Sequence, residues 1–198
     1  MDALNLAGSS LNNKRRKQDF YPTPPEATKA LIDTGLILGR RVWEPACGDG
    51  RMAEVFRAAG YSCTASDIRE TGYGLTVPVD FLRDQGAYPC GFFDAIVTNP
   101  PFNLAAEFID RAIDHHRPKV VAMLLKANYW HAAKRIKLFE KHQPSHILAL
   151  TWRLDFVGGE RGGNPLMDCA WVVWTEGAVE TKYALLKKPE TQLCLSPV

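Results

Sequence analysis

Several common features are missing from this sequence of 198 residues. It holds no apolar run of about 18 residues or more, so no membrane-spanning helix is expected, and its polar N-terminus lacks the apolar segment of a signal peptide. Charge is nearly balanced, because 24 Lys and Arg face 22 Asp and Glu, and the net charge of +2 does not by itself indicate a nucleic-acid partner. We therefore expect an ordinary globular protein of the cytoplasm.

Cysteine and histidine are sparse and scattered. The five cysteines are odd in number and form no CxxC pair, which argues against a disulfide framework and against a zinc site made of thiolates. Of the five histidines, His115 and His116 are adjacent, so on a helix they point apart instead of sharing a face. We expect no metal site and a reducing compartment.

The length of the chain indicates one domain after a short arm. Residues 1–19 are polar without periodicity and carry the basic run Lys14-Arg15-Arg16-Lys17, which is either a solvated tail or a segment that contacts phosphates. We expect 1–19 to be a flexible arm and 20–198 to be a single domain. Residues 157–165 carry four glycines and are expected to form a mobile loop.

Strand and helix patterns alternate along the domain. Thr23-Pro24-Pro25-Glu26 has the capping-box pattern, so a first helix is expected directly after Thr23. The further helices are expected at 51–59, 104–116 and 129–141, and the strands at 41–44, 61–66, 77–81, 93–98, 120–125, 146–151 and 170–175. This alternation predicts an α/β fold, in which helices cover both faces of a mostly parallel sheet.

A glycine-rich turn follows the first expected strand. Gly48 and Gly50 permit a tight turn and a close approach of a ligand, at the strand end where α/β sheets bind ligands. Asp67 follows Gly48 by 19 residues, the spacing of an acid that accepts from ribose hydroxyls. The pattern is not the three-glycine dinucleotide fingerprint, and Glu44 would repel a pyrophosphate but suit an amine-bearing ligand such as S-adenosylmethionine. The alternative is a structural turn with an acidic surface.

Two further segments lie at expected strand ends. Asp80 and Phe81 either hold an adenine amine and ring or are simply a turn residue and a core residue. Asn99-Pro100-Pro101-Phe102 follows the strand expected at 93–98, and its prolines stop that strand and fix the backbone. A rigid loop with an amide side chain and free carbonyls can accept hydrogen bonds from an –NH2 group. Phe102 offers a flat face to a planar substrate.

These motifs occur in one order along the chain, and that order resembles the class I S-adenosylmethionine-dependent methyltransferases. The Asn-Pro-Pro-Phe loop is similar to that of their amino-methyltransferases. Tyr21-Pro22-Thr23-Pro24-Pro25 is similar to the N-terminal cofactor motif of DNA N6-adenine methyltransferases, and the motif order resembles their gamma arrangement. The resemblance covers residues 20–175 and implies a Rossmann-like three-layer sandwich with a mostly parallel seven-stranded sheet.

The resemblance also implies residue roles. Thr23 would contact the methionine carboxylate, Asp67 the ribose, and Asn99 with the Pro100 carbonyl the target amine, while Phe102 would stack on the target base. The expected cofactor contacts are Tyr21, Thr23, Glu44, Ala46, Gly48, Gly50, Asp67, Ile68, Asp80 and Phe81. The expected catalytic loop is Asn99, Pro100, Pro101 and Phe102.

The implied reaction is transfer of a methyl group from S-adenosylmethionine to the N6 amine of a flipped adenine in double-stranded DNA, by direct displacement and without a metal. The separate target-recognition domain of larger family members is not expected, so the chain resembles compact phage or prophage enzymes. Recognition would then come from loops, from the arm or from a partner. Methylation of guanine N2 in ribosomal RNA or of glutamine N5 in protein uses the same loop, and a non-catalytic binding module with this fold is a further alternative.

Other side chains remain open between two roles. A second aromatic could stack on the target base, and the candidates are Trp130, Trp152 and Phe156. The alternative for each is a place in the core. Four basic residues line a phosphate track or are simply solvated charges, namely Lys126, Lys134, Arg153 and Arg161. The sequence does not indicate an oligomeric state.

Overall fold

The computed structural model describes residues 21–83, 86–156 and 167–190. The arm expected at 1–19 and the glycine-rich loop expected at 157–165 lie outside the described residues, and so does Arg161. Among the described helices, none is long and apolar enough to cross a membrane.

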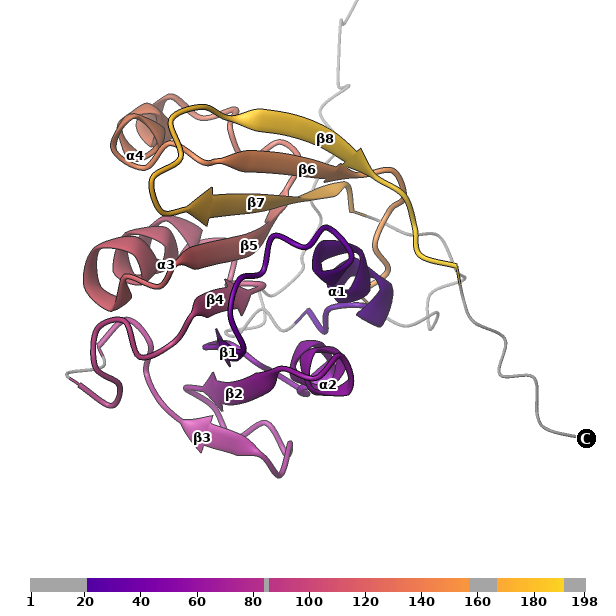
Figure 1. Ribbon diagram of the computed structural model, residues 1–198, viewed down its shortest axis with the longest axis vertical. Helices are drawn as coiled ribbons and strands as arrows, with labels where there is room; N and C mark the ends of the chain where they lie inside the picture. Colours follow the sequence, from indigo (N-terminus) through magenta and orange to yellow (C-terminus); the bar gives the residue numbers. More distant parts are fainter. Residues whose placement is uncertain (1–20, 84–85, 157–166, 191–198) are drawn as a thin grey trace, which may run out of the picture.

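One mixed sheet of eight strands forms the centre of the molecule, in the order β3-β2-β1-β4-β5-β7-β6-β8 (Figure 1). The strands are β1 (Arg41–Glu44), β2 (Ser62–Asp67), β3 (Thr76–Pro78), β4 (Ala95–Thr98), β5 (Val120–Lys126), β6 (His146–Leu150), β7 (Cys169–Thr175) and β8 (Lys182–Leu186). Of the described strands, only β7 is antiparallel to its neighbours β5 and β6. The carboxyl ends of β1, β2, β4 and β5 therefore meet at one edge of the sheet.

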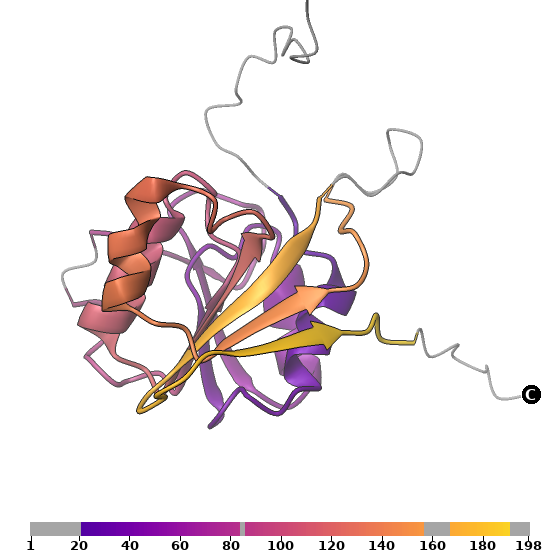
Figure 2. The same ribbon diagram turned by 90° about the horizontal axis from the view of Figure 1, so that it is seen from above.

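Helices cover both faces of this sheet (Figures 1 and 2). One face carries α1 (Pro25–Ile32) and α2 (Arg51–Ala58), whereas the other carries α3 (Ala105–Asp110) and α4 (Ile136–Lys141). Two separate apolar clusters fill the two interfaces, and the largest fully buried side chains are Trp171 and Phe56 in one and Trp43 in the other. The predicted α/β class and three-layer arrangement are thus confirmed.

Some predicted boundaries are wrong. The eighth strand, β8, was not expected, because four of its five residues are exposed and give no buried pattern at this edge of the sheet. The helix expected at 129–141 starts only with the 3-10 turn η2 (Ala133–Arg135). The carbonyl of Tyr129 accepts from the Arg135 guanidinium instead of from a helical amide. The helix expected at 104–116 changes after Asp110 into the π-helix η1 (Arg111–His116).

The first helix begins one residue later than the capping box predicts. Pro24 is the N-cap residue of α1, and no side-chain hydrogen bond caps this helix. The backbone angles of Pro24, φ −59° and ψ 135°, are those of polyproline II. The prediction that Thr23 caps α1 is therefore wrong, and the Thr23 hydroxyl has another partner, described below.

Candidate active site

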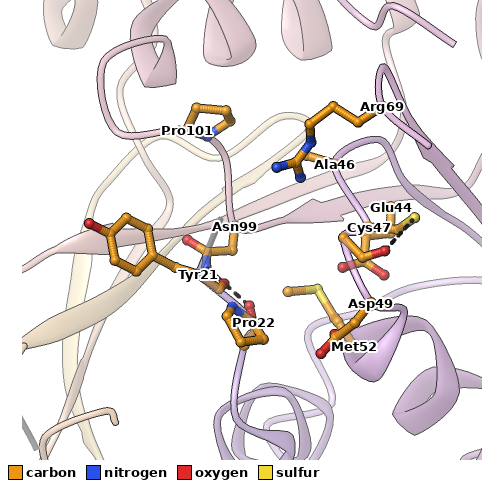
Figure 3. A pocket seen from close by; sticks show the side chains of 12 residues that line it. Tyr21, Pro22, Glu44, Ala46, Cys47, Asp49, Met52, Arg69, Asn99 and Pro101 are labelled. Carbon is orange, nitrogen blue, oxygen red and sulfur yellow. Dashed lines mark hydrogen bonds between the residues drawn. The ribbon is translucent and has the colours of Figure 1, made fainter. Parts of the chain in front are cut away.

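A pocket of about 380 Å³, including space open to solvent, lies at the carboxyl ends of β1 and β4 (Figure 3). Seven residues predicted as site residues line it: Tyr21, Thr23, Glu44, Ala46, Gly48, Asn99 and Pro101. Five further lining residues were not predicted: Pro22, Cys47, Asp49, Met52 and Arg69. The fold therefore brings the N-terminal segment, the glycine turn and the proline loop to one place, although they are far apart in the sequence.

The glycine turn needs its two glycines for conformational reasons. Gly48 has φ +53° and Gly50 has φ +81°, a region that side chains with a Cβ rarely adopt. A Cβ at Gly50 would also lie 2.5 Å from the ring of Tyr73. Gly48 lines the pocket, whereas Gly50 does not line it and is the N-cap residue of α2.

Glu44 is the last residue of β1 and is the buried acid of the pocket. Its side chain is only 2% exposed, and within the described residues its Oε2 has no hydrogen-bond partner. Burial raises the pKa of Glu44 well above its ordinary value, and the neighbouring charge of Asp49 raises this pKa further. Because an unpaired buried carboxylate gains most from an opposite charge, this position suits a ligand that brings an ammonium group.

Asp67, the last residue of β2, is fully engaged by protein donors. Its two oxygens accept from the Gly48 amide at 3.0 Å and from the Arg69 amide at 3.0 Å. The Arg69 guanidinium adds bonds of 2.9 Å and 3.1 Å. These four donors take about all the lone-pair positions of a carboxylate. A ribose could bind Asp67 only if it displaced the Arg69 side chain, which lines the pocket while Asp67 does not.

Asn99 follows β4 and is held by the N-terminal segment. Its Nδ2 donates to the Tyr21 carbonyl and to the Thr23 hydroxyl, each at 3.1 Å. Its Oδ1 is buried and has no partner within the described residues. In Figure 3, the Asn99 side chain lies between Tyr21 and the Glu44 side of the pocket, and its oxygen is turned to the Tyr21 side. An unpartnered buried acceptor favours a ligand with an N–H or O–H donor.

An aromatic group adjoins Asn99. The ring centroids of Tyr21 and Phe102 lie 5.3 Å apart, and those of Tyr21 and Phe156 lie 5.6 Å apart. The Lys126 ammonium sits 4.4 Å from the centroid of Phe102, a cation–π contact at the end of β5. Of the aromatics considered as second stacking partners, Phe156 belongs to this group, whereas Trp130 packs on Phe139.

Other predicted cofactor contacts lie elsewhere. Phe81 is 2% exposed and packs against Trp43 and Phe108 at 5.1 Å and 4.8 Å between ring centroids. Asp80 accepts from the amide of Leu82 at 3.1 Å, as a turn residue does. This placement matches the alternative of a turn residue and a core residue. The remaining predicted site residues that do not line the pocket are Ile68, which is exposed, Pro100, which is buried, and Phe102, which is half-buried.

One group of side chains in the described part of the chain has the composition of a metal site. Ligand atoms of Asp110, Asp114 and His142 all lie within 4.8 Å of one another. The Lys141 ammonium is 3.0 Å from Asp110 and 2.6 Å from Asp114, so one internal cation already pairs with both carboxylates. None of these residues lines the pocket.

No family model and no curated protein matches the chain. Solved structures do match it. A candidate RNA methyltransferase from Pyrococcus horikoshii aligns with a TM-score of 0.58 at 15% identity, over 78% of this chain and 85% of that one. A candidate class I S-adenosylmethionine-dependent methyltransferase from Listeria monocytogenes aligns with a TM-score of 0.59 at 14% identity, over 83% and 65%.

Another matching structure is the methyltransferase subunit of a type I restriction-modification system from Streptococcus thermophilus. It aligns with a TM-score of 0.63 at 12% identity, over 83% of this chain and 47% of that one. The chain has the class I methyltransferase fold. It spans about half the length of the Streptococcus protein, and identities this low establish shared architecture, whereas chemistry depends on the residues of this pocket.

Proposed function

We propose that this chain is an S-adenosylmethionine-dependent methyltransferase that acts on the exocyclic N6 amine of adenine in DNA. The observation that carries the proposal is the Asn99 amide, whose nitrogen is held by protein while its buried oxygen has no partner in the described structure. Such an oxygen can accept a hydrogen bond from an amine of the substrate. Asn99 lines the same pocket as Glu44, whose Oε2 is a second buried oxygen without a partner in the described structure.

The residues of the pocket fit the cofactor. Glu44 would bind the ammonium of its methionine end, and Gly48, without a side chain, would allow the backbone to lie against the ligand. Asp67 would accept from the ribose hydroxyls after the Arg69 guanidinium has left it. Bound S-adenosylmethionine supplies an electrophilic methyl group on a sulfonium sulfur.

The chain's own residues would activate the amine by position. The lone pair of the adenine amine is delocalised into the ring, which makes the nitrogen a poor nucleophile. Asn99 Oδ1 and the Pro100 carbonyl would each accept one of its hydrogens, favour a pyramidal nitrogen and stabilise the positive charge that develops on it. Because a paired base cannot reach this pocket, the adenine would have to be flipped out and stacked on Phe102.

One feature supports DNA as the substrate, and a second supports a nucleic acid over a protein. The segment from Tyr21 to Pro25, which resembles the N-terminal motif of DNA adenine methyltransferases, lines the pocket with three residues, namely Tyr21, Pro22 and Thr23. Charge is also divided across the site, with Glu44 and Asp49 on the cofactor side and Lys126 on the ring of Phe102. A cation beside the acceptor site favours a polyanionic substrate over a neutral glutamine side chain.

The proposal is tested by mass spectrometry of nucleosides after incubation of unmethylated DNA with the protein and S-adenosylmethionine. We expect N6-methyladenine to accumulate. Transfer of labelled methyl groups to ribosomal RNA and to protein is measured in parallel. Label only in RNA would favour guanine N2, in line with the architecture shared with the Pyrococcus protein, and label only in protein would favour glutamine. Cofactor binding without any transfer would indicate a binding module.

A further inference from the structure

The structure joins two proline-rich segments that lie far apart in the sequence. Asn99 of the proline loop donates to Thr23, 76 residues earlier, and to Tyr21, 78 residues earlier, in the segment before α1. Both bonds come from the same Nδ2 atom and measure 3.1 Å. The N-terminal segment therefore holds the side chain of Asn99 as well as lining the pocket.

These two bonds decide which way the amide faces. The Tyr21 carbonyl can only accept, so the amide atom that points to it must be the nitrogen. The Thr23 hydroxyl accepts the second hydrogen of Nδ2 and thus prevents rotation of the amide about its last bond. Oδ1 therefore bonds to neither Tyr21 nor Thr23 and is left without a partner among the described residues.

Both sides of this contact are rigid. Tyr21, Thr23 and Asn99 each precede a proline, which restricts their backbones to extended conformations. Thr23 is only 6% exposed, so its hydroxyl has little water to compete for Asn99. The hydroxyl is also not used as a helix cap, since α1 has no side-chain cap. Its described role in the fold is the bond to Asn99.

We propose that Thr23 is a positioning residue that orients the Asn99 amide, so that Oδ1 can accept a hydrogen bond from the amine that receives the methyl group. This inference rests on the proposed function, in which Asn99 Oδ1 binds the amine. Thr23 acts through Asn99 and touches neither the methyl group nor the nitrogen that receives it. Loss of the hydroxyl alone should therefore impair turnover and leave the fold intact.

The test is the isosteric variant Thr23→Val, with Thr23→Ser as the conservative replacement that keeps the hydroxyl. Loss of one orienting hydrogen bond should lower kcat about tenfold in Thr23→Val, while KM for DNA changes less than about threefold. Thr23→Ser should restore kcat to within about threefold of the parent chain. Thr28→Val is the matched control, because Thr28 is a buried threonine whose hydroxyl has no partner in the described structure, and its kcat should not change.

A second measurement does not depend on activity. The side-chain amide hydrogens of Asn99, assigned by their loss in Asn99→Ala, should exchange slowly in the parent chain and in Thr23→Ser but faster in Thr23→Val. Unchanged kcat and exchange in Thr23→Val, or equal losses in Val and Ser, would overturn the positioning role while methyl transfer by the parent chain still stands. If the parent chain transfers no methyl group, the proposed function fails, and the catalytic purpose assigned to Thr23 fails with it. The exchange experiment then tests only the orientation of the amide.

Discussion

The polar side chains at the two ends of strands β1 and β4 differ in whether they have hydrogen-bond partners. At the amino end, Asp94 accepts from the amides of Arg40 and Arg41, each at 3.0 Å, and from the Arg41 guanidinium at 3.3 Å. At the carboxyl end, Glu44 Oε2 and Asn99 Oδ1 are buried, and the described structure provides no partner for either. The satisfied end lowers the free energy of the fold, whereas the unsatisfied end keeps its hydrogen-bonding capacity for a ligand.

The same contrast is visible in acidity. The hydrogen bonds from Arg41 lower the pKa of Asp94 to about 2, whereas burial raises the pKa of Glu44 well above its ordinary value. Asp94 bonds to the first residue of β1, and Glu44 is the last residue of the same strand. One short strand thus has a carboxyl group whose ionised form is favoured at one end and a carboxyl group whose ionised form is disfavoured at the other, where the pocket lies.

Replacement of Asn99 by Ala should give the largest effect on the carboxyl end. We expect kcat to fall at least about 100-fold, because the amine loses a positioned acceptor, while the Kd for S-adenosylmethionine changes less than about threefold. Single-turnover transfer and calorimetry measure the two quantities. Asp94→Asn at the opposite strand end is the control for activity. An active Asn99→Ala protein would remove Asn99 from the reaction.

Asp67→Ala should weaken cofactor binding by about 10- to 100-fold, the loss expected for hydrogen bonds to a charged group. Calorimetry with S-adenosylmethionine measures it. The companion variant Arg69→Met frees two positions on the Asp67 carboxylate and should keep or increase the affinity. If instead Arg69→Met weakened binding as much as Asp67→Ala, Arg69 would be the residue that holds the ligand.

Asp94→Asn should lower the free energy of unfolding by about 2 kcal/mol at pH 7 and leave kcat unchanged. Because the native pKa of about 2 lies below the ordinary value of 3.8, the stabilisation is complete above that ordinary value and disappears as the pH falls towards 2. Urea denaturation at pH 7 and near pH 3 should therefore show a smaller difference between parent and variant at the lower pH. A difference that does not depend on pH would contradict this account.

Glu44→Gln should give the smallest change in stability, and one of opposite sign. The native pKa of Glu44 is raised above 4.5, so the parent loses stability as the pH rises from there towards the native pKa, and the glutamine variant does not. At pH 8 the variant should be more stable by about 1 kcal/mol, or a few degrees in Tm, and should bind S-adenosylmethionine more weakly. Thermal unfolding at pH 8 and pH 4 checks it, since the gain should vanish at pH 4.

Sequence patterns correctly predicted those elements whose structure depends on interactions within a few residues. The apolar run of β5 and the glycines at 48 and 50 each have a cause within a few residues, and the structure contains both the strand and the turn. Capping-box spacing was misleading at Thr23, because the competing partner, Asn99, is 76 residues away. Sequence spacing cannot show which of two donors, the helix amide or the distant Asn99 Nδ2, the Thr23 hydroxyl will accept from.

Other features that the sequence left open or did not indicate have the same origin. From sequence alone, Phe81 is equally compatible with packing on an adenine ring and with packing in the core. Only its contacts with Trp43 and Phe108 place it in the core. Arg69 left a weak signal, an arginine two residues after the predicted ribose acid, but its fork on Asp67 depends on the turn between them. The exposed strand β8 has no apolar alternation that a pattern could detect.

The bonds from Asn99 to Tyr21 and Thr23 also have a consequence for the order in which the molecule is assembled. During synthesis the N-terminal segment emerges first, but its partner follows almost eighty residues later, so the contact must form after β1 and β2 are complete. Contacts of such high sequence separation form late, since a long loop has to close first. A molecule with a finished sheet but an undocked segment would be folded by most spectroscopic criteria, and its Asn99 amide would still lack a fixed orientation.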